Sequence, residues 1–209
     1  NVNLYYLDFE IAIVWAGGVD SDGLPITANG AKTVHHGLEA ELIWTPRPRM
    51  GSRLTLSYNR AEFDDFTEFG WDGSFRDHSG NRIAGIPEWL ASVDVGAGWG
   101  PVDLLLSVRC VGEFHLDNTE NNRKSPELRE DPDYIAPVNR AFATADLTAR
   151  IDLGDALTGL LRAQGATLDL RVNNLTDDLY TTFGYVWGPE PTWIPAATRS
   201  LYGGLAIDW

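Results

Sequence analysis

Apolar and polar residues alternate with a period of two along eight segments of the chain. The segment 88–99 is the clearest example, because Trp89, Val93 and Trp99 share one parity while Glu88 and Asp94 share the other. Successive side chains of a β-strand point to opposite sides, so each segment is predicted to be a strand with one apolar and one polar face. The predicted strands span residues 2–14, 33–44, 53–63, 88–99, 102–114, 139–152, 166–173 and 200–209.

The first predicted strand is longer than strands of soluble proteins usually are. Its apolar set is predicted to share one face: Tyr5, Leu7, Phe9, Ile11 and Ile13. A strand of this length suits a segment that crosses a bilayer at a slant. The pattern therefore favours hydrocarbon as the solvent of the apolar faces, with a lumen on the polar side.

The predicted connections alternate between long and short. Long loops are predicted at 15–32, 64–86, 115–138 and 175–197, and short turns at 45–52 and 98–101. The connection 153–165 is intermediate and could hold a short helix around 156–162, and Ser125 could begin one helical turn. Bacterial outer-membrane barrels keep short turns on the periplasmic side and long loops outside. We therefore predict an all-β fold, an antiparallel up-and-down transmembrane β-barrel segment of about eight meandering strands.

Aromatic residues mark both ends of the predicted span. Trp89 and Trp99 are ten residues apart, which at a rise of about 3.3 Å and a tilt of about 40° projects to roughly 25 Å, the height of an outer-membrane apolar band. The chain also ends on Trp209, as membrane strands often end on an interfacial aromatic. A soluble β-sandwich explains the alternation but neither of these features. A porin-like channel or a complete eight-stranded barrel remains a second alternative.

Composition narrows the possible functions. The 209 residues carry a formal net charge of −14, which argues against a nucleic-acid partner because phosphate binding needs clustered Lys and Arg. The single Cys110 excludes an internal disulfide. The chain also lacks a run of about 18 apolar residues, so no transmembrane helix is expected. The residues suggest no catalytic constellation, so we expect no enzymatic activity, no cofactor and no metal site.

Five stretches, in order along the chain, resemble the C-terminal third of TonB-dependent outer-membrane receptors. They are Tyr5–Glu10, Asn29–Glu41, Gly85–Pro87, Val172–Tyr180 and the closing segment Pro195–Trp209. The first is most similar to ferric-citrate-type receptors. The fourth resembles the family's V-x-N-L-x-D-x-x-Y segment. In the closing segment Trp209 replaces the commoner Phe.

The resemblance implies a barrel of about 22 strands around an N-terminal plug. Residues 1–209 are then expected to be the C-terminal part of the barrel domain, a fragment without the plug and the earlier strands. The implied function is energy-coupled uptake of a scarce nutrient, such as a ferric siderophore or ferric citrate, in the outer membrane of a Gram-negative bacterium. The implied partners are membrane lipid and lipopolysaccharide, the receptor's own plug, the TonB complex, the barrel-assembly machinery and a small iron chelate.

Candidate functional residues fall into three sets. Aromatic and polar loop residues are expected to meet an extracellular ligand: Trp71, Asp72, Phe75, His78, Tyr185, Trp187 and Trp193. The closing strand carries the expected assembly signal: Tyr202, Gly204, Ile207 and Trp209. Polar-face residues are expected to pair across strands or with the plug: Glu88, Asp94, Arg109, Asp146, Arg150, Asp169 and Arg171. Loose His/Asp/Glu clusters around His78 and His115 lack the spacing of a calcium loop.

Overall fold

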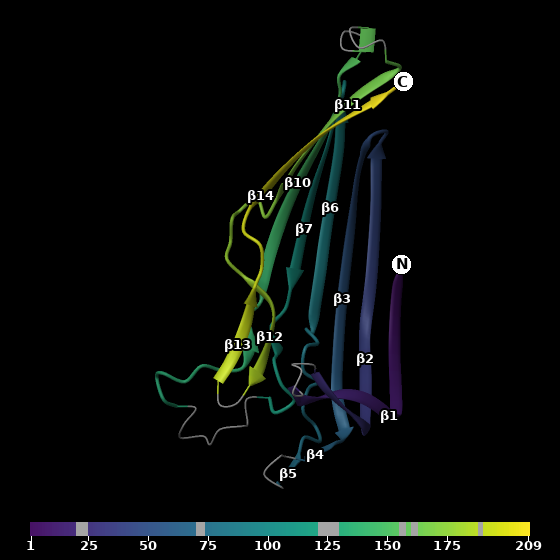
Figure 1. The fold of residues 1–209 in the computed structure, drawn as a ribbon. Helices are drawn as coiled ribbons and strands as arrows, with labels where there is room; N and C mark the ends of the chain where they lie inside the picture. Colours follow the sequence, from purple (N-terminus) through teal and green to yellow (C-terminus); the bar gives the residue numbers. More distant parts are fainter. Residues whose placement is uncertain (20–24, 70–73, 121–129, 155–157, 160–162, 188–189) are drawn as a thin grey trace.

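Eight strands form one antiparallel sheet in the computed structural model, which describes residues 1–19, 25–69, 74–120, 130–154, 158–159, 163–187 and 190–209 (Figure 1). The strands follow chain order across the sheet, with β1 and β14 at its two ends. They are β1 (Val2–Val19), β2 (Pro25–Arg47), β3 (Met50–Asp65), β6 (Trp89–Trp99), β7 (Val102–Val111), β10 (Phe142–Asp152), β11 (Gly165–Asn173) and β14 (Ser200–Asp208). The predicted all-β meander is confirmed. Among the described residues, no helix is long and apolar enough to cross a membrane.

Three small hairpins occupy the long connections. They are β4 (Thr67–Phe69) with β5 (Phe75–Asp77), β8 (Phe114–His115) with β9 (Val138–Asn139), and β12 (Thr181–Trp187) with β13 (Glu190–Pro195). All lie at the end of the sheet away from the C-terminus, which we call the loop end; the short β2–β3 and β6–β7 turns lie at the opposite, turn end (Figure 1). The helical turn predicted at Ser125 lies outside the described residues, and Thr158 and Gly159 are helical within the predicted 156–162 segment.

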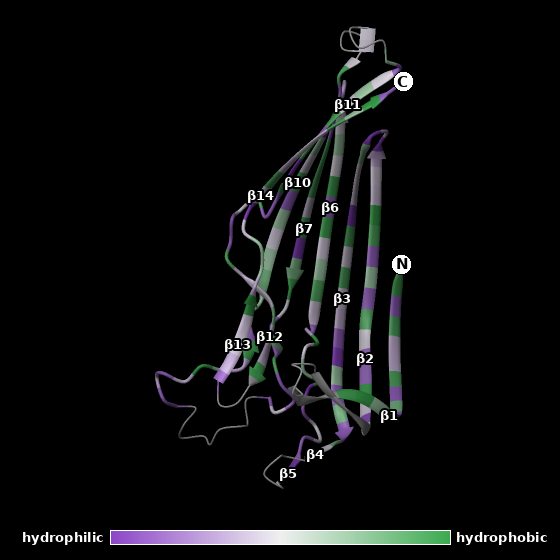
Figure 2. Ribbon diagram, viewed as in Figure 1, coloured by the Kyte–Doolittle hydropathy of each residue, from purple (hydrophilic) through white to green (hydrophobic). Residues whose placement is uncertain are grey.

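Strand register sorts side chains onto two faces, because residues directly opposite one another point to the same side. One row across five strands is entirely apolar: Leu42, Leu54, Val93, Val108 and Ala145. The neighbouring row is polar: Glu41, Thr55, Ser92, Arg109 and Thr144. We call these sides the apolar face and the polar face. The alternation appears as banding along each strand in Figure 2.

The apolar face is exposed in this chain. Leu42 and Trp99 are 62% and 64% exposed, and Trp89 and Leu106 are exposed as well. The additional sheets among the described residues are the three two-stranded hairpins, so no second large sheet covers this face. The alternative of a soluble sandwich required these residues to meet across a dry interior, and it is wrong. Aromatic rings mark the loop end of the face, where Tyr58 and Trp89 lie 4.5 Å apart between ring centroids.

The first hairpin differs from its prediction. Residues 15–32 were expected to form a loop, but β1 continues to Val19 and β2 begins at Pro25. Backbone pairing sustains these strands where the sequence no longer alternates and contains glycine.

The expected common face of Tyr5, Leu7, Phe9, Ile11 and Ile13 is also wrong. Tyr5, Leu7 and Phe9 pair opposite Gly37, His35 and Thr33, on the side of Glu39, which is the polar face. Register shifts between Phe9 and Ile13 then reverse the alternation, so that the exposed Ile11 and Ile13 lie on the other side. A β-bulge adds a residue to one strand and changes the face of all residues after it.

Candidate functional site

Charged residues of the polar face pair across neighbouring strands, as the sequence predicted. Asp146 on β10 lies 3.5 Å from Arg109 on β7 and 3.6 Å from Arg171 on β11, measured between side-chain oxygen and nitrogen. Arg150 donates to Asp169 at 2.8 Å. The three arginine side chains remain more than half exposed. The polar face can therefore offer its guanidinium groups to a further partner while keeping its cross-strand pairs.

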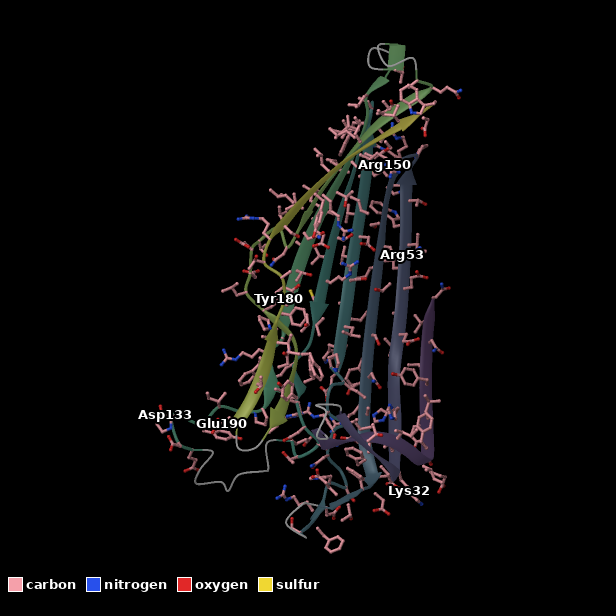
Figure 3. The ribbon with its side chains drawn as sticks, in the orientation of Figure 1. Lys32, Arg53, Asp133, Arg150, Tyr180 and Glu190 are labelled. Atoms are coloured by element: carbon pink, nitrogen blue, oxygen red, sulfur yellow. The ribbon has the colours of Figure 1, made fainter. Side chains whose placement is uncertain are left out.

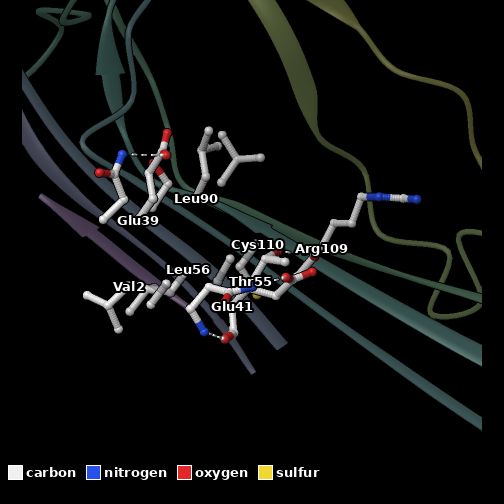
Figure 4. A pocket seen from close by; sticks show the side chains of 15 residues that line it. Val2, Glu39, Glu41, Thr55, Leu56, Leu90, Arg109 and Cys110 are labelled. Atoms are coloured by element: carbon white, nitrogen blue, oxygen red, sulfur yellow. Dashed lines mark hydrogen bonds between the residues drawn. The ribbon is translucent and has the colours of Figure 1, made fainter. Parts of the chain in front are cut away.

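A shallow depression of about 610 Å³ lies on the sheet between β1 and β7 (Figure 4). Glu39 and Glu41 stand on one side of it, where they accept hydrogen bonds from Asn3 and Asn1. Arg109 extends from the other side (Figure 4). Its floor includes the small residues Thr55 and Ser92, whose hydroxyl groups lie 2.6 Å apart. Small side chains between charged rims leave room for a segment of protein to lie against the sheet.

The loop between β5 and β6 is joined to the start of the β7–β10 connection by side-chain hydrogen bonds. Arg82 Nε and its backbone N–H both donate to Glu120 Oε1, at 2.9 and 2.7 Å. Asn81 Nδ2 donates to the carbonyl of Asn118 at 2.8 Å, and the Asn118 carboxamide accepts from the backbone of Ala84 at 3.1 Å. The two loops therefore form one unit.

A second set of contacts joins the β7–β10 connection to the β12–β13 hairpin. Phe114, Leu116 and Val186 form a buried apolar cluster, and Trp193 packs against it. The fit around Leu116 is close: a Cβ atom on Gly184 would lie 2.8 Å from Leu116 Cδ1. Trp193 Nε1 donates to the carbonyl of Val138 at 3.1 Å. Three connections that are distant in sequence thus form a continuous assembly at the loop end.

A groove of about 1100 Å³ lies within this assembly, between the β7–β10 connection and the segment that follows β11. Phe142 and Tyr180 form part of its wall as a stacked pair with ring centroids 4.7 Å apart. Tyr180 lies where the main sheet meets the β12–β13 hairpin (Figure 3). Trp193, Arg140, His115 and Glu120 also line the groove, which we call the loop groove. Aromatic walls with a few charged groups are typical of small-molecule sites.

The two ionisable groups beside Arg82 have altered pKa values. Burial lowers the pKa of His115 below its ordinary 6.5, and the positive charge of Arg82 lowers it further. Burial alone would raise the pKa of Glu120, but hydrogen bonds from the backbone and guanidinium of Arg82 outweigh it, so the net pKa is lowered. His115 is therefore held neutral and Glu120 ionised at neutral pH.

The family-like stretch Val172–Tyr180 forms the turn that leaves β11. Asn174 is 3% exposed and adopts a left-handed backbone with φ of 50°. Its side chain accepts from the backbone N–H of Asp178 and donates to two carbonyls, those of Asp178 and Ala197. Asp177 accepts from the backbone and guanidinium of Arg199 at 2.8 and 3.2 Å. These contacts close the base of the last long connection.

The predicted ligand residues occupy different positions. Trp71 and Asp72, and the side chain of Trp187, lie outside the described part of the structure. Trp193 lines the loop groove, and Tyr185 is half-buried in β12. Phe75 is exposed on β5. His78 is 4% exposed and lies 2.9 Å from Glu68, so it lies within its loop rather than on the surface.

Sequence reasoning missed several residues of the loop groove. Arg140 and Phe142 lie just before and at the start of β10 and showed no special spacing, whereas Tyr180 was noted as the last residue of the family-like stretch but not as a ligand residue. Their proximity depends on two hydrogen bonds, from Thr181 Oγ1 to Asn139 Oδ1 at 2.7 Å and from Asn139 Nδ2 to the Thr181 carbonyl at 3.0 Å. These bonds join segments 42 residues apart in the sequence.

Known proteins share the fold of this chain. Residues 1–175 match the sequence profile of a family described as TonB dependent receptor-like, beta-barrel. The chain belongs to the TonB-dependent receptor β-barrel family. A sequence search against curated proteins gives no match.

Solved structures agree on the fold of this receptor chain. The siderophore receptor PiuA from Acinetobacter baumannii has a TM-score of 0.68 at 16% identity, over 99% of this chain and 25% of that one. The ferric citrate transporter FecA has 0.66 at 19% identity, over 99% and 28%. The ferric yersiniabactin uptake receptor FyuA from Yersinia pestis has 0.61 at 20% identity, over 88% and 25%.

The chain spans about a quarter of the length of these solved receptors. Its relatives are transport receptors rather than enzymes, in agreement with the expectation from sequence. In the closing strand of this receptor chain, Tyr202 and Gly204 lie on the polar face, and Ile207 lies opposite Ala166 on the apolar face. Trp209 follows β14 and is exposed.

Proposed function

We propose that the chain forms the C-terminal wall and part of the ligand-capturing loops of an outer-membrane receptor in a Gram-negative bacterium. The complete receptor would import a scarce nutrient, such as a ferric siderophore or ferric citrate, by energy-coupled transport. The main support for this proposal is the position of the loop groove at the loop end of the sheet. The apolar face of this sheet is apolar throughout the span. The similarity to the ferric citrate transporter FecA and the ferric yersiniabactin uptake receptor FyuA supports the substrate class.

The loop groove is the proposed site of first ligand contact. Phe142, Tyr180 and Trp193 offer flat apolar area at low conformational cost, and Arg140 adds a positive charge. Trp71, Asp72, Phe75, Tyr185 and Trp187 are proposed to extend the contact surface from neighbouring loops. The site needs no cofactor or bound metal of its own, since an iron chelate would arrive as cargo.

The polar face is the proposed seat of the receptor's own plug. Arg109, Arg150 and Arg171 keep exposed guanidinium groups on this face, and the depression beside Glu41 can accept a plug segment. The TonB complex would act on the plug to release the ligand inward. The apolar face would meet lipid and, toward the loop end, lipopolysaccharide. The barrel-assembly machinery would bind the closing strand through Tyr202, Gly204, Ile207 and Trp209.

Uptake of radiolabelled ferric citrate by cells that carry the complete receptor as their single iron receptor tests this proposal. Uptake is expected to require both the receptor and an energised inner membrane, and to stop when a protonophore is added. Uptake that continues without energy would identify a passive channel and contradict the proposal. A panel of ferric siderophores, each supplied alone, extends the test to other chelates.

Groove variants locate the site within the receptor. Tyr180→Ala and Phe142→Ala each remove one ring of the stacked pair and are expected to weaken chelate binding about two- to twelvefold, since a stacked aromatic contact contributes about 0.5–1.5 kcal/mol beyond its buried area. Asp133→Ala, at an exposed loop position that does not line the groove, is the control and should bind as the unaltered receptor does. Equal binding by all three variants would exclude the loop groove.

A further inference from the structure

Arg82 lies at the centre of a junction between three chain segments at the loop end. Its Nη1 donates to Glu88 at 3.1 Å, its Nε donates to Glu120 at 2.9 Å, and its Nη2 lies 3.0 Å from His115 Nε2. Glu88 immediately precedes β6, whereas His115 and Glu120 line the loop groove. One guanidinium group therefore connects the loop end of the sheet to the rim of the loop groove.

The contact between Arg82 and His115 requires a neutral imidazole. A guanidinium group has five N–H donors and no acceptor, so His115 Nε2 must accept through a lone pair. The single proton of the ring then resides on Nδ1, which is buried without a hydrogen-bond partner among the described residues. Protonation of Nε2 would place an N–H donor and a positive charge against the arginine, and the contact would be lost.

Several charged groups surround this imidazole. Arg82 contributes the positive charge in direct contact, and Glu120, Asp117 and Glu113 contribute negative charges on His115's own connection. Glu88 adds a further carboxylate through Arg82. The acids favour protonation of His115, whereas burial and the contacting guanidinium oppose it, and the opposition is the larger effect. The neighbouring Glu120 already accepts two hydrogen bonds from Arg82, which limits its ability to offset the arginine's charge.

We propose that Arg82 is the positioning residue of the loop groove: it fixes His115 and Glu120 at the rim, and protonation of His115 releases this junction. The backbone contacts of Gly85 and the side-chain contacts of Asn118 keep the two loops adjacent. Loss of the contact between Arg82 and His115 is therefore a local change, which frees the imidazole and loosens the residues around it. Acidic surroundings would change the shape and charge of the groove without unfolding the wall.

The direction of the pH effect follows from the two lowered pKa values. A group whose pKa is lower in the folded state stabilises that state above its ordinary pKa and loses this contribution as pH falls. For His115 the junction is intact above its ordinary value of 6.5 and weakens as pH falls through the lower folded value. Glu120, whose pKa is also lowered, acts in the same direction at more acidic pH.

Nitrogen-15 NMR of histidine-labelled complete receptor in lipid nanodiscs tests the junction directly. At pH 7.5 the His115 signal, assigned by its loss in His115→Gln, is expected to show the Nδ1–H tautomer and to titrate below the ordinary histidine value of 6.5. Arg82→Met should abolish the tautomer preference and raise the titration midpoint. Arg76→Met, on β5 of the same connection, is the matched control and should leave the His115 signal unchanged. An Nε2–H tautomer in the unaltered receptor would overturn the proposal.

Hydrogen exchange separates positioning from general support of the loop. After correction for intrinsic rates, protection of residues 82–85 and 113–120 should fall between pH 7.5 and pH 5, by up to about tenfold for each unit by which the pKa of His115 is lowered. His115→Gln keeps a neutral acceptor that cannot titrate, so its protection should not fall. An equal fall in His115→Gln would assign the effect to another group and refute the proposal. Neither measurement uses a ligand, so either can fail while the proposed uptake function stands.

Discussion

The two halves of the sheet differ in height. Strands β6, β7, β10, β11 and β14 are 9 to 11 residues long, whereas β1, β2 and β3 have 18, 23 and 16 residues. About ten residues at a tilt of about 40° cover roughly 25 Å, which is the apolar thickness of an outer membrane. The shorter strands therefore match the bilayer, and the longer ones extend well beyond it at the loop end.

The solvent of each region accounts for its packing. Beyond the bilayer, apolar side chains of β1–β3 need protein partners, and Val14, Ala31 and Phe63 form a buried cluster there with Phe66, which follows β3. Within the span, the apolar face of β6 and β7 is exposed in this chain. Lipid is the proposed partner of this face. One sheet thus combines a protein core at its loop end with a lipid-facing surface along its span, and substitutions should affect the two regions differently.

The largest effect is expected in the protein core beyond the bilayer. Phe63 is 1% exposed and stacks on Phe66 with ring centroids 4.7 Å apart. Phe63→Ala should lower the free energy of unfolding by about 3–5 kcal/mol, because it removes apolar contacts and leaves a cavity. Urea unfolding of the complete receptor in lipid vesicles measures this change. Phe75→Ala, at an exposed position on β5, should cost less than about 0.5 kcal/mol, and an equal cost would refute the buried cluster.

A charge on the apolar face should have the next largest effect. Val93→Arg and Leu106→Arg each place a cation near the middle of the span and should destabilise the receptor by about 2–4 kcal/mol. Asp94→Arg, one residue further along β6 on the polar face, should cost far less. The same vesicle unfolding assay gives all three values. If they agree within error, the assignment of the two faces is incorrect.

The turn after β11 should show an intermediate effect that depends on backbone conformation. Asn174→Ala removes four side-chain hydrogen bonds from a buried site with φ of 50°, at an expected cost of about 1–3 kcal/mol. Asn174→Gly loses the same hydrogen bonds but tolerates the left-handed backbone, so it should be less harmful. Hydrogen exchange of residues 174–180 compares the two variants. Alanine performing as well as glycine would show that backbone strain contributes nothing.

The smallest effect is expected at the turn end. Arg49 joins two turns through Asp103 at 2.7 Å and the carbonyl of Gly100 at 2.8 Å, and both charged side chains are about half exposed. Exposed ion pairs contribute little, so Arg49→Ala should cost about 0.2–1 kcal/mol in the unfolding assay. Arg49→Gly should cost less than alanine because φ at this position is 58°. A loss above about 2 kcal/mol would mean that the turns act as a structural clamp.

The period-two pattern predicted most of the wall but little of the loop groove. Strands such as β6 and β10 lie within the span and have regular register, so their alternation identified both faces correctly. The bulges of β1 escaped prediction because a single extra residue leaves no mark in composition. Trp193 was predicted from its aromatic character, whereas Arg140 and Tyr180 join the groove through contacts between distant segments.

The sequence alone determined the strand count, the two-sided character of the sheet and the receptor family, because these depend on local periodicity and short motifs. Tertiary structure decided which face Tyr5 and Ile11 take, how far β1–β3 extend, and which loop residues meet around Arg82. The reason is physical: periodicity records the solvent on each side of a strand. Register shifts and loop contacts depend on partners that lie tens of residues away.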